Sequence, residues 1–483
     1  MTTTQDRLPL YVDLDGTLIH SDLLLESFLE LIRRNLLLVF LVPFWMLRGK
    51  AFLKREIARR VQLRVDLLPY NKPFLEFLRE QKQAGRRLVL ISASDTSLVQ
   101  AVAAHLELFD EAVGSDGVVN CSGTRKLAKI LERDKAFCYA GDGRVDLQVW
   151  KGASAAILVD ADVALKRDAA ALTRIEREFD RPRRGLRPYR RALRLHQWLK
   201  NTLVFLPLAL AHEINNPELI WQATLAFLSF GLCASSVYVL NDLLDLTSDR
   251  QHRSKCRRSF AAGDIPLLSG LLLSPVLLVL AFAVAMPLPR AFIIILALYY
   301  FCTGLYSFVL KRMMLVDVIM LAALYTLRII SGAAAISVVP SFWLLAFSMF
   351  LFFSLAVVKR YTELDYLREA GIAQSEGRGY YAQDLSMMAM FGAASAFMSV
   401  MVFALYINND DTREQYLTPE ILWLICPLLL YMITRIWLLT ARGQIHEDPI
   451  VFALKDRVSQ LVTLACGAML WLANVDWRSL ILQ

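Results

Sequence analysis

Long apolar stretches recur through the second half of this 483-residue chain, and they restrict what that half can fold into. Most are about 20 residues long, which is the length that an α-helix needs to cross the hydrocarbon core of a bilayer. They lie near residues 202–212, 219–240, 267–288, 291–310, 313–335, 342–358, 387–407, 420–440 and 458–475. We therefore predict an all-α transmembrane bundle of about nine helices, the first of them short.

Composition divides the chain into two domains. Hydrophobic residues make up 56% of the sequence and the mean hydropathy is +0.43, too high for an ordinary soluble protein, whereas residues 1–200 are conventionally charged. The net charge of +8 does not indicate nucleic-acid binding, because Lys and Arg gather at the ends of apolar stretches. The seven cysteines lack metal-like spacing, and we expect no disulfides. Residues 1–7 are polar, so we expect no signal peptide and a cytoplasmic amino terminus.

The first half of the chain alternates short strands with helices. Apolar runs of strand length occur at Leu8–Val12, Arg87–Ile91 and Ala136–Ala140. Helical patterns lie between and after them, around residues 73–84, 97–106 and 124–133. This order is typical of a parallel sheet with crossover helices, so we predict a doubly wound α/β domain.

Polar residues follow each predicted strand, at the edge where α/β sheets hold their ligands. The ordered set is Asp13-Leu14-Asp15-Gly16-Thr17, then Ser92, then Lys126, then Gly141-Asp142 with Asp146. Over roughly residues 8–165 this set resembles the haloacid dehalogenase superfamily of phosphatases. The resemblance implies an α/β fold and hydrolysis of phosphate esters.

The resemblance also implies a role for each residue. Asp13 would be the nucleophile and Asp15 the general acid and base. Ser92 and Lys126 would offset charge on the transferred phosphoryl group, although Arg125 and Lys129 are alternatives to Lys126. Mg²⁺ would bind the carboxylates of Asp13, Asp142 and Asp146.

Residues 20–72 interrupt this fold, and we expect a helical cap there. The apolar run Leu36–Leu47 is broken by Pro43 and is too short to span a bilayer. Basic residues flank it, namely Arg33, Arg34, Arg48 and Lys50. Its apolar face could receive a lipid-linked substrate, lie on the membrane, or simply pack within the cap.

Basic residues set the expected orientation in the membrane. They are dense in a linker over residues 180–200, which we expect at anionic headgroups: Arg181, Arg183, Arg184, Arg187, Arg190, Arg191, Arg194 and Lys200. They return in alternate loops near residues 250–258, 311–312, 359–368 and 455–457. Positive loops face the cytoplasm, so the carboxyl terminus would lie outside. We predict domains at residues 1–179, a linker at 180–200 and a transmembrane domain at 201–483.

An acidic signature closes the second apolar stretch: Asn241-Asp242-Leu243-Leu244-Asp245-Leu246-Thr247-Ser248-Asp249. Helical spacing predicts three carboxylates along one helical face, where divalent cations would offset their repulsion. Together with Tyr306, Lys311, Asp317, Arg328 and Gly332, the signature resembles the UbiA-type intramembrane prenyltransferase superfamily. The resemblance implies that Asn241, Asp242, Asp245 and Asp249 bind Mg²⁺.

Three further stretches resemble one branch of that superfamily, the decaprenyl-phosphate phosphoribosyltransferases: Gln197–Asn201, Lys359–Leu364 and Asp448–Arg457. The second acidic motif of aromatic prenyltransferases is absent after the sixth apolar stretch, where Lys359, Arg360 and Glu363 stand instead. The resemblance implies that substrate is bound by Lys200, Tyr306, Lys311, Arg328, Lys359, Arg360, Glu363 and Arg457. Lys200 and Arg457 could instead be interfacial anchors.

The charge pattern predicts a multi-pass protein of the bacterial inner membrane with both active sites in the cytoplasm. The two resemblances imply an enzyme that transfers 5-phosphoribose from phosphoribosyl pyrophosphate to polyprenyl phosphate, and whose phosphatase domain then removes the 5-phosphate to give polyprenyl-phosphoryl ribose for envelope glycans. The alternative is a prenyltransferase that uses a prenyl diphosphate and an aromatic or other acceptor, with a regulatory or unrelated phosphatase domain. Polyprenyl length, the downstream glycan and homo-oligomerisation stay open.

Overall fold

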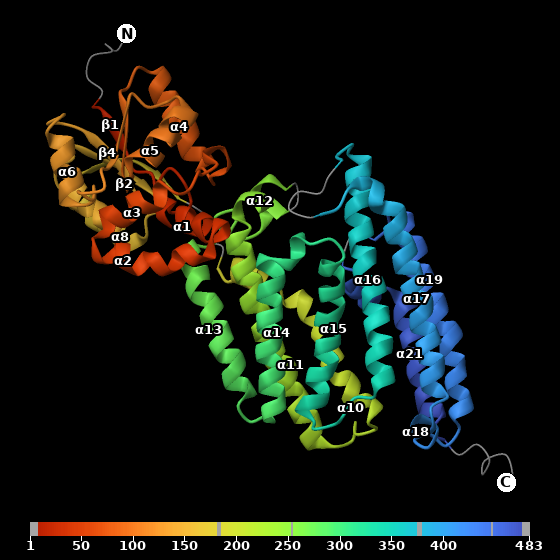
Figure 1. Cartoon of the computed structure of the whole chain (residues 1–483). Coiled ribbons are helices and arrows are strands. Elements are labelled where there is room, and N and C mark those ends of the chain that lie inside the picture. Colours follow the sequence, from red (N-terminus) through yellow and green to blue (C-terminus); the bar gives the residue numbers. More distant parts are fainter. Residues whose placement is uncertain (1–7, 181–184, 253–254, 374–378, 446–447, 476–483) are drawn as a thin grey trace. The chain divides into compact units, whose positions relative to one another are not determined.

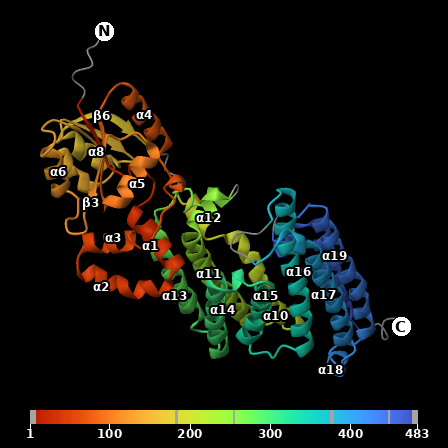
Figure 2. The same cartoon turned by 45° about the horizontal axis from the view of Figure 1, so that its top comes forward.

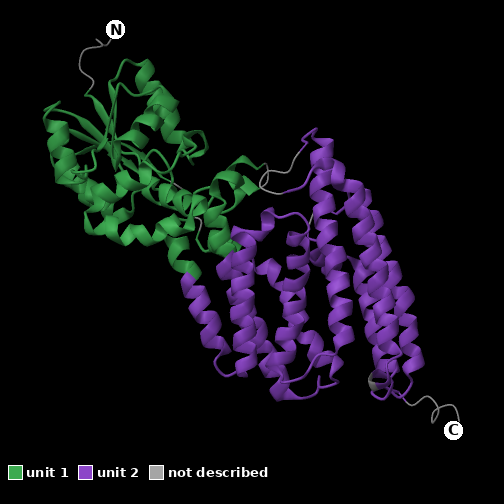
Figure 3. Cartoon of the chain, in the orientation of Figure 1, with its two compact units in different colours: residues 1–193, 238–274 green, residues 194–237, 275–483 purple. Residues whose placement is uncertain are grey.

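The computed structural model describes residues 8–180, 185–252, 255–373, 379–445 and 448–475, which form two compact units (Figure 3). The first unit contains residues 1–193 and 238–274, and the second contains residues 194–237 and 275–483. Three residues of the predicted basic linker, Arg181, Arg183 and Arg184, lie outside the described residues. Because residues 238–274 belong to the first unit, a segment of the predicted transmembrane half folds with the amino-terminal domain.

A six-stranded parallel sheet forms the centre of the first unit. The strand order β3-β2-β1-β4-β5-β6 places β1 between β2 and β4. The strands are β1 (Leu10–Val12), β2 (Leu88–Asp95), β3 (Glu111–Ser115), β4 (Cys138–Gly141), β5 (Ala155–Val159) and β6 (Arg174–Phe179). All residues of β1 and β4 are buried, as expected for strands covered on both faces. The predicted α/β doubly wound fold is confirmed.

Helices cover both faces of this sheet (Figure 1; Figure 2). Leu10 and Val12 point to one face, where they pack with α4 (Lys72–Gln83) and α5 (Thr96–Leu106). Tyr11 points to the other face because side chains alternate along a strand. That face is covered by α6 (Thr124–Leu131), α7 (Leu147–Trp150) and α8 (Val163–Ala170), with η3 (Arg144–Asp146) before α7.

The cap of the first unit is helical. It comprises α1 (Leu23–Arg34), η1 (Leu36–Leu41), α2 (Val42–Leu47), α3 (Lys50–Ala58) and η2 (Val65–Leu67). The Asp22 carboxylate begins α1 by accepting a hydrogen bond from the Leu25 N–H, one of the donors that a helix start leaves unpaired. Leu31, Trp45 and Ile57 form the small core of the cap.

A buried ion pair holds residues 238–274 to the cap. Arg250 lies in α12 (Leu246–Gln251) and donates hydrogen bonds of 2.6 and 3.0 Å to the Glu26 carboxylate of α1. The two side chains are only 8% and 5% exposed. The first unit also contains α9 (Arg187–Ala192) and η5 (Lys255–Arg257). The Ser259 hydroxyl donates to the Pro188 carbonyl and supplies a second contact to the amino-terminal part.

The second unit is helical. Two long helices, α11 (Pro217–Leu244) and α13 (Leu267–Ala285), run from one unit into the other. The remaining elements are η4 (Leu195–Phe205), α10 (Leu206–Leu210), α14 (Arg290–Phe308), η6 (Leu310–Arg312), α15 (Val316–Ala335), α16 (Phe342–Glu369), η7 (Ala382–Asp384), α17 (Leu385–Ile407), α18 (Asp410–Arg413), η8 (Pro419–Leu424), α19 (Ile425–Ala441), α20 (Pro449–Lys455) and α21 (Arg457–Leu472). Gly332 lets η4 lie against α15, because a Cβ there would stand 2.1 Å from the Val204 carbonyl oxygen.

Seven helices of the described residues are long and apolar enough to cross a membrane: Pro217–Leu244, Leu267–Ala285, Arg290–Phe308, Val316–Ala335, Phe342–Glu369, Ala382–Ile407 and Pro419–Ala441. The predicted count of about nine was therefore approximate. The first apolar stretch folds into the end of η4 and the five-residue α10, and the last forms the 16-residue α21. These helices are shorter than the roughly 20 residues that a span needs.

We expect Arg250→Ala to loosen α12, because Glu26 would remain buried without its cation. Removing one partner of a buried ion pair typically costs about 3–5 kcal/mol. Hydrogen–deuterium exchange on the full-length protein should show faster exchange of the α12 amides. The exposed Arg257 supplies the control, since Arg257→Ala should leave this exchange nearly unchanged. Equal protection of α12 in the two variants would contradict the expectation.

Candidate functional sites

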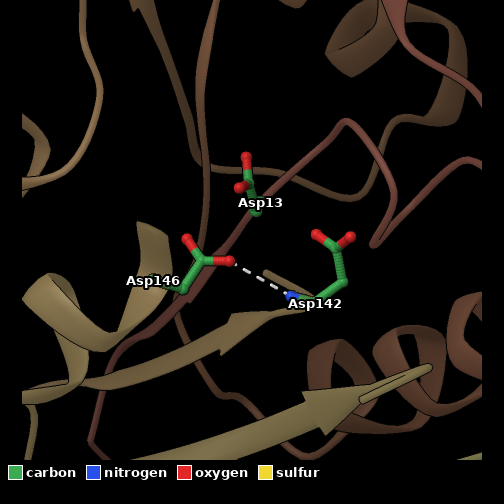
Figure 4. A group of neighbouring side chains, drawn as sticks. All are labelled: Asp13, Asp142 and Asp146. Atoms are coloured by element: carbon green, nitrogen blue, oxygen red, sulfur yellow. Dashed lines mark hydrogen bonds between the residues drawn. The ribbon is translucent and has the colours of Figure 1, made fainter. Parts of the chain in front are cut away.

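Three carboxylates meet at the carboxyl ends of β1 and β4 (Figure 4). Asp13 follows β1, Asp142 follows β4 and Asp146 ends η3, and one oxygen of each lies within 4.8 Å of the others. The N–H groups of Asp142 and Gly143 donate to the Asp146 carboxylate at 3.2 and 3.0 Å and so fix its position. Gly16, with φ of +82°, makes room for Asp142, because a Cβ there would stand 2.2 Å from its carboxylate oxygen.

Lys126 is the cation in contact with this carboxylate cluster. Its ammonium lies 2.8 Å from a carboxylate oxygen of Asp13 and donates to the Tyr139 hydroxyl, which in turn donates to Asp146. Burial lowers the pKa of Lys126, but the charges of Asp13 and Asp146 outweigh that effect and raise the pKa overall. Of the two alternatives weighed from the sequence, Lys129 donates to the Gly114 carbonyl and Arg125 is exposed.

The cluster has the chemistry of a divalent-cation site. Burial, and then the charge of Asp13, raise the pKa values of both Asp142 and Asp146. Three carboxylates facing one lysine leave an excess of negative charge in a buried place, which a cation would offset. Carboxylate oxygens are the ligands that Mg²⁺ prefers, so Asp13, Asp142 and Asp146 fit this ion.

Asp15 lies beside this cluster and is held by three donors. The hydroxyls of Ser92 and Ser94 donate to its carboxylate at 2.9 and 2.7 Å, and the Leu23 N–H donates at 2.7 Å. Burial, followed by the charges of Asp22 and Asp13, raises the pKa of Asp15 to about 6. A carboxyl group with a pKa near neutrality is suited to both donating and accepting a proton. The sequence predicted Ser92 but missed Ser94.

The cap contributes a lysine that the sequence did not single out. Lys54 of α3 donates to the Ala93 carbonyl at 2.6 Å and to the Asn120 side-chain oxygen at 3.1 Å. Burial lowers the pKa of Lys54, and the nearby charge of Asp15 opposes that shift. Its only signal in the sequence was a basic residue in a mixed charged and apolar segment of the cap, which is too common to predict a site.

The acidic signature is split between two helices. α11 ends at Leu244 and α12 begins at Leu246, so the signature does not lie on one unbroken helix, and Asp245 lies at the junction. Helical backbone bonds nevertheless continue across it, from the Asp245 N–H to the Asn241 carbonyl and from the Asp249 N–H to the Asp245 carbonyl. Arg258 bonds to Asp242 at 3.1 Å and to Asp249 at 2.7 Å. From the sequence, Arg258 counted only as a topology residue. The carboxylates of Asp242 and Asp249 are both buried, and buried carboxylates close together are the kind of oxygen ligands that suit Mg²⁺.

In the second unit, two predicted substrate-binding lysines converge on Asp448. Lys200 of η4 lies 2.6 Å and Lys359 of α16 lies 3.7 Å from the same Asp448 oxygen. The Tyr325 hydroxyl lies 3.2 Å from it. Burial would raise the pKa of Asp448, but Lys200 and Lys359 outweigh that effect and lower it to about 2. The sequence did not predict this role for Asp448.

The other predicted residues of this unit occupy separate places. Arg360 is 1% exposed and bonds to Asp317, Glu363 and Tyr306, so protein partners take up its guanidinium. Arg328 bonds to Asn201, to the Leu324 carbonyl and to Tyr299. Two basic residues stand at other elements: Lys311 in η6, where it is half-buried, and Arg457 at the exposed start of α21.

Comparison with known families matches both halves of the chain. The UbiA prenyltransferase family matches residues 201–454, and the haloacid dehalogenase-like hydrolase family matches residues 10–151. An uncharacterized protein y4nM of Sinorhizobium fredii is 37% identical over 94% of this chain and 89% of its own length. Nodulation protein NoeC of Azorhizobium caulinodans is 33% identical, over 57% of this chain and 90% of its own. The decaprenyl-phosphate phosphoribosyltransferase of Mycolicibacterium smegmatis is 29% identical, over 57% of this chain and 88% of its own length.

We expect Lys126→Ala to lower kcat for hydrolysis of p-nitrophenyl phosphate by at least about 100-fold, because it removes the cation in contact with Asp13. Lys129→Ala is the matched control from the same helix and should stay close to the wild-type rate, since the Lys129 ammonium donates to the Gly114 carbonyl and to no carboxylate of the cluster in the described residues. Equal losses of kcat in the two variants would show that Lys126 is not part of the site.

Proposed function

Because the chain belongs to the UbiA prenyltransferase family and carries a haloacid dehalogenase-like hydrolase domain, we propose that it is a bifunctional enzyme with two successive reactions. The family and the seven apolar helices identify an integral membrane protein. The first reaction would join 5-phosphoribose from phosphoribosyl pyrophosphate to a polyprenyl phosphate. The second would remove the 5-phosphate from that lipid. We place the protein in the inner membrane as part of this proposal, and the positive loops favour both reactions on its cytoplasmic side.

The lysine pair at Asp448 carries the transferase proposal. Lys359 stands where prenyltransferases of aromatic acceptors have a second acidic motif, and with Lys200 it forms a cationic site. Ammonium groups bind phosphate, and both substrates of phosphoribosyl transfer carry phosphate. The relative named decaprenyl-phosphate phosphoribosyltransferase aligns with the transmembrane part of this chain. This similarity supports the phosphoribosyltransferase branch of the family.

In the proposed transfer, a phosphate oxygen of the lipid attacks C1 of ribose and pyrophosphate leaves. Both families generally depend on Mg²⁺, and Mg²⁺ held by Asn241, Asp242, Asp245 and Asp249 would neutralise the departing pyrophosphate. Lys200 and Lys359 would hold a substrate phosphate, with Asp448 fixing their positions. Arg360 would position Glu363 and Tyr306, which it already bonds, and Lys311, Arg328 and Arg457 remain further substrate-binding proposals.

In the proposed hydrolysis, Asp13 attacks phosphorus and the ester oxygen leaves as the ribose hydroxyl. Asp15 would protonate that oxygen and later take a proton from the water that cleaves the aspartyl phosphate. Lys126 would offset charge on the phosphoryl group, while Ser92 and Ser94 would orient Asp15. A raised pKa near 6 lets Asp15 serve in both steps.

Prenyl transfer is the second candidate, because the family that matches residues 201–454 is described as prenyltransferases. Incubation of the purified protein with Mg²⁺, phosphoribosyl pyrophosphate and polyprenyl phosphate distinguishes phosphoribosyl transfer from prenyl transfer. A ribosylated lipid lacking the 5-phosphate is expected from the wild type, detected by mass spectrometry. No phosphoribosylated lipid, with prenylation of 4-hydroxybenzoate from a prenyl diphosphate instead, would establish prenyl transfer.

We expect the Asp13→Asn variant to carry out the first reaction but not the second, since it lacks the nucleophile of the hydrolase site and keeps the acidic signature intact. The phosphorylated lipid should accumulate at close to the wild-type rate of transfer. Asp245→Asn is the complementary variant and should give neither lipid. Full dephosphorylation by Asp13→Asn would contradict the assignment of the second reaction to this domain.

The transfer reaction should also depend on pH through Asp249. Burial raises the pKa of Asp249 to about 6, even though Arg258 opposes the shift. Below that pH the carboxyl group binds a proton, which competes with Mg²⁺. The Mg²⁺ concentration for half-maximal transfer should therefore rise as the pH falls below about 6, and excess Mg²⁺ should restore the rate. A half-maximal concentration that is the same at acid and neutral pH would contradict this.

A further inference from the structure

The apolar run of the cap has one packed side and one exposed side. Leu38, Val42 and Trp45 face inward and join the cap core. Five large side chains of the same run are more than half exposed: Leu37 (70%), Phe40 (71%), Phe44 (66%), Met46 (59%) and Leu47 (86%). Packing within the cap therefore explains only the inner side, and the outer side stays exposed among the described residues of the first unit.

This exposed side is continuous, unlike other exposed apolar residues of the sheet domain. Val118 and Val163, for example, are 82% and 78% exposed but stand singly on a loop and at the start of α8. Single apolar residues are ordinary on protein surfaces, whereas a contiguous patch marks an interaction site. The docking face, defined here as the outer side of residues 36–47, is such a patch.

Charge around the docking face identifies its partner as a lipid surface. Arg33 and Arg34 precede the run and Arg48 and Lys50 follow it, all four exposed, and no Asp or Glu occurs from residue 36 to residue 50. Two short helices with an apolar outer side and basic flanks match an anionic membrane surface better than another protein. Twelve residues are too few to span the bilayer, and the same chain is embedded in one.

We propose that the docking face of the cap inserts into the headgroup boundary of an anionic bilayer leaflet. Phe40 and Phe44 would enter the acyl boundary, and the four basic residues would contact anionic headgroups. The bilayer then covers apolar surface that would otherwise face water.

Docking would also select the substrate of the hydrolase, a consequence that rests on the proposed function. α3 follows the docking face after Gly49 and carries Lys54, whose ammonium donates to the Ala93 carbonyl. The next residue, Ser94, donates a hydrogen bond to Asp15. The membrane-bound helices and the hydrolase site are thus joined by a single helix. A phosphate attached to a membrane lipid would reach Asp13 more readily than a soluble phosphate ester would.

Photocrosslinking tests the docking face directly. The full-length protein would carry p-benzoylphenylalanine at Phe40 or Phe44, in nanodiscs of phosphatidylcholine and phosphatidylglycerol. Illumination should give lipid adducts at both positions and at least about ten-fold fewer at Val163, the exposed control. Adducts to protein at Phe40 and Phe44, equal lipid adducts at Val163, or no lipid adduct would overturn the proposal.

Kinetics test the substrate selection separately. The double variant Phe40→Asp with Phe44→Asp should raise KM for dephosphorylation of the phosphoribosylated lipid in vesicles by at least about ten-fold. Hydrolysis of p-nitrophenyl phosphate should stay at the wild-type rate, as should both activities of Val163→Asp. Equal loss on both substrates, or no loss on the lipid, would overturn the selection. If the wild type hydrolyses neither substrate, the proposed function fails. The photocrosslinking experiment then still decides whether the cap docks on the bilayer.

Discussion

The buried ion pair between Glu26 and Arg250 is the contact on which the organisation of the first unit depends. Glu26 belongs to the cap of the hydrolase domain, and Arg250 directly follows Asp249, the last residue of the acidic signature. The two residues are 224 positions apart and lie in different family matches. Neither charge can stay buried without the other. A segment of the transferase sequence is therefore built into the hydrolase unit.

The fold and much of the hydrolase site could be predicted because a parallel sheet brings strand ends together. Asp13 and Asp142 each follow an apolar strand, and the topology alone brings them together. Lys126 could not be separated from its neighbours, since the rotation of α6 decides which lysine points inward. Lys54 and Asp448 were missed because their partners come from distant segments; Asp448 meets a lysine 248 residues away. The helix count was approximate because two of the apolar stretches form helices too short to meet the length of a span in the described residues.

The two acidic clusters follow one electrostatic design. In each, several carboxylates are buried and a basic side chain among the described residues offsets part of their charge: Lys126 at Asp13 and Asp146, and Arg258 at Asp242 and Asp249. Such clusters bind a divalent cation readily, because the remaining repulsion between carboxylates is relieved. Both proposed reactions handle phosphate groups, whose charge the same cation would offset. Under the proposed function, one chain would combine two sites of like chemistry, one that forms a lipid-linked phosphosugar and one that removes its 5-phosphate.

The proposed function requires that both reactions act on the same lipid at the same chain. The most direct measurement compares the wild type in nanodiscs with an equal mixture of nanodiscs holding either Asp13→Asn or Asp245→Asn, both supplied with phosphoribosyl pyrophosphate and polyprenyl phosphate. We predict that the wild type releases dephosphorylated ribosyl lipid, whereas the mixture accumulates the phosphorylated lipid, because lipid made in one disc cannot reach the other hydrolase. Equal dephosphorylation in the mixture, or a wild type that stops at the phosphorylated lipid, would contradict the claim.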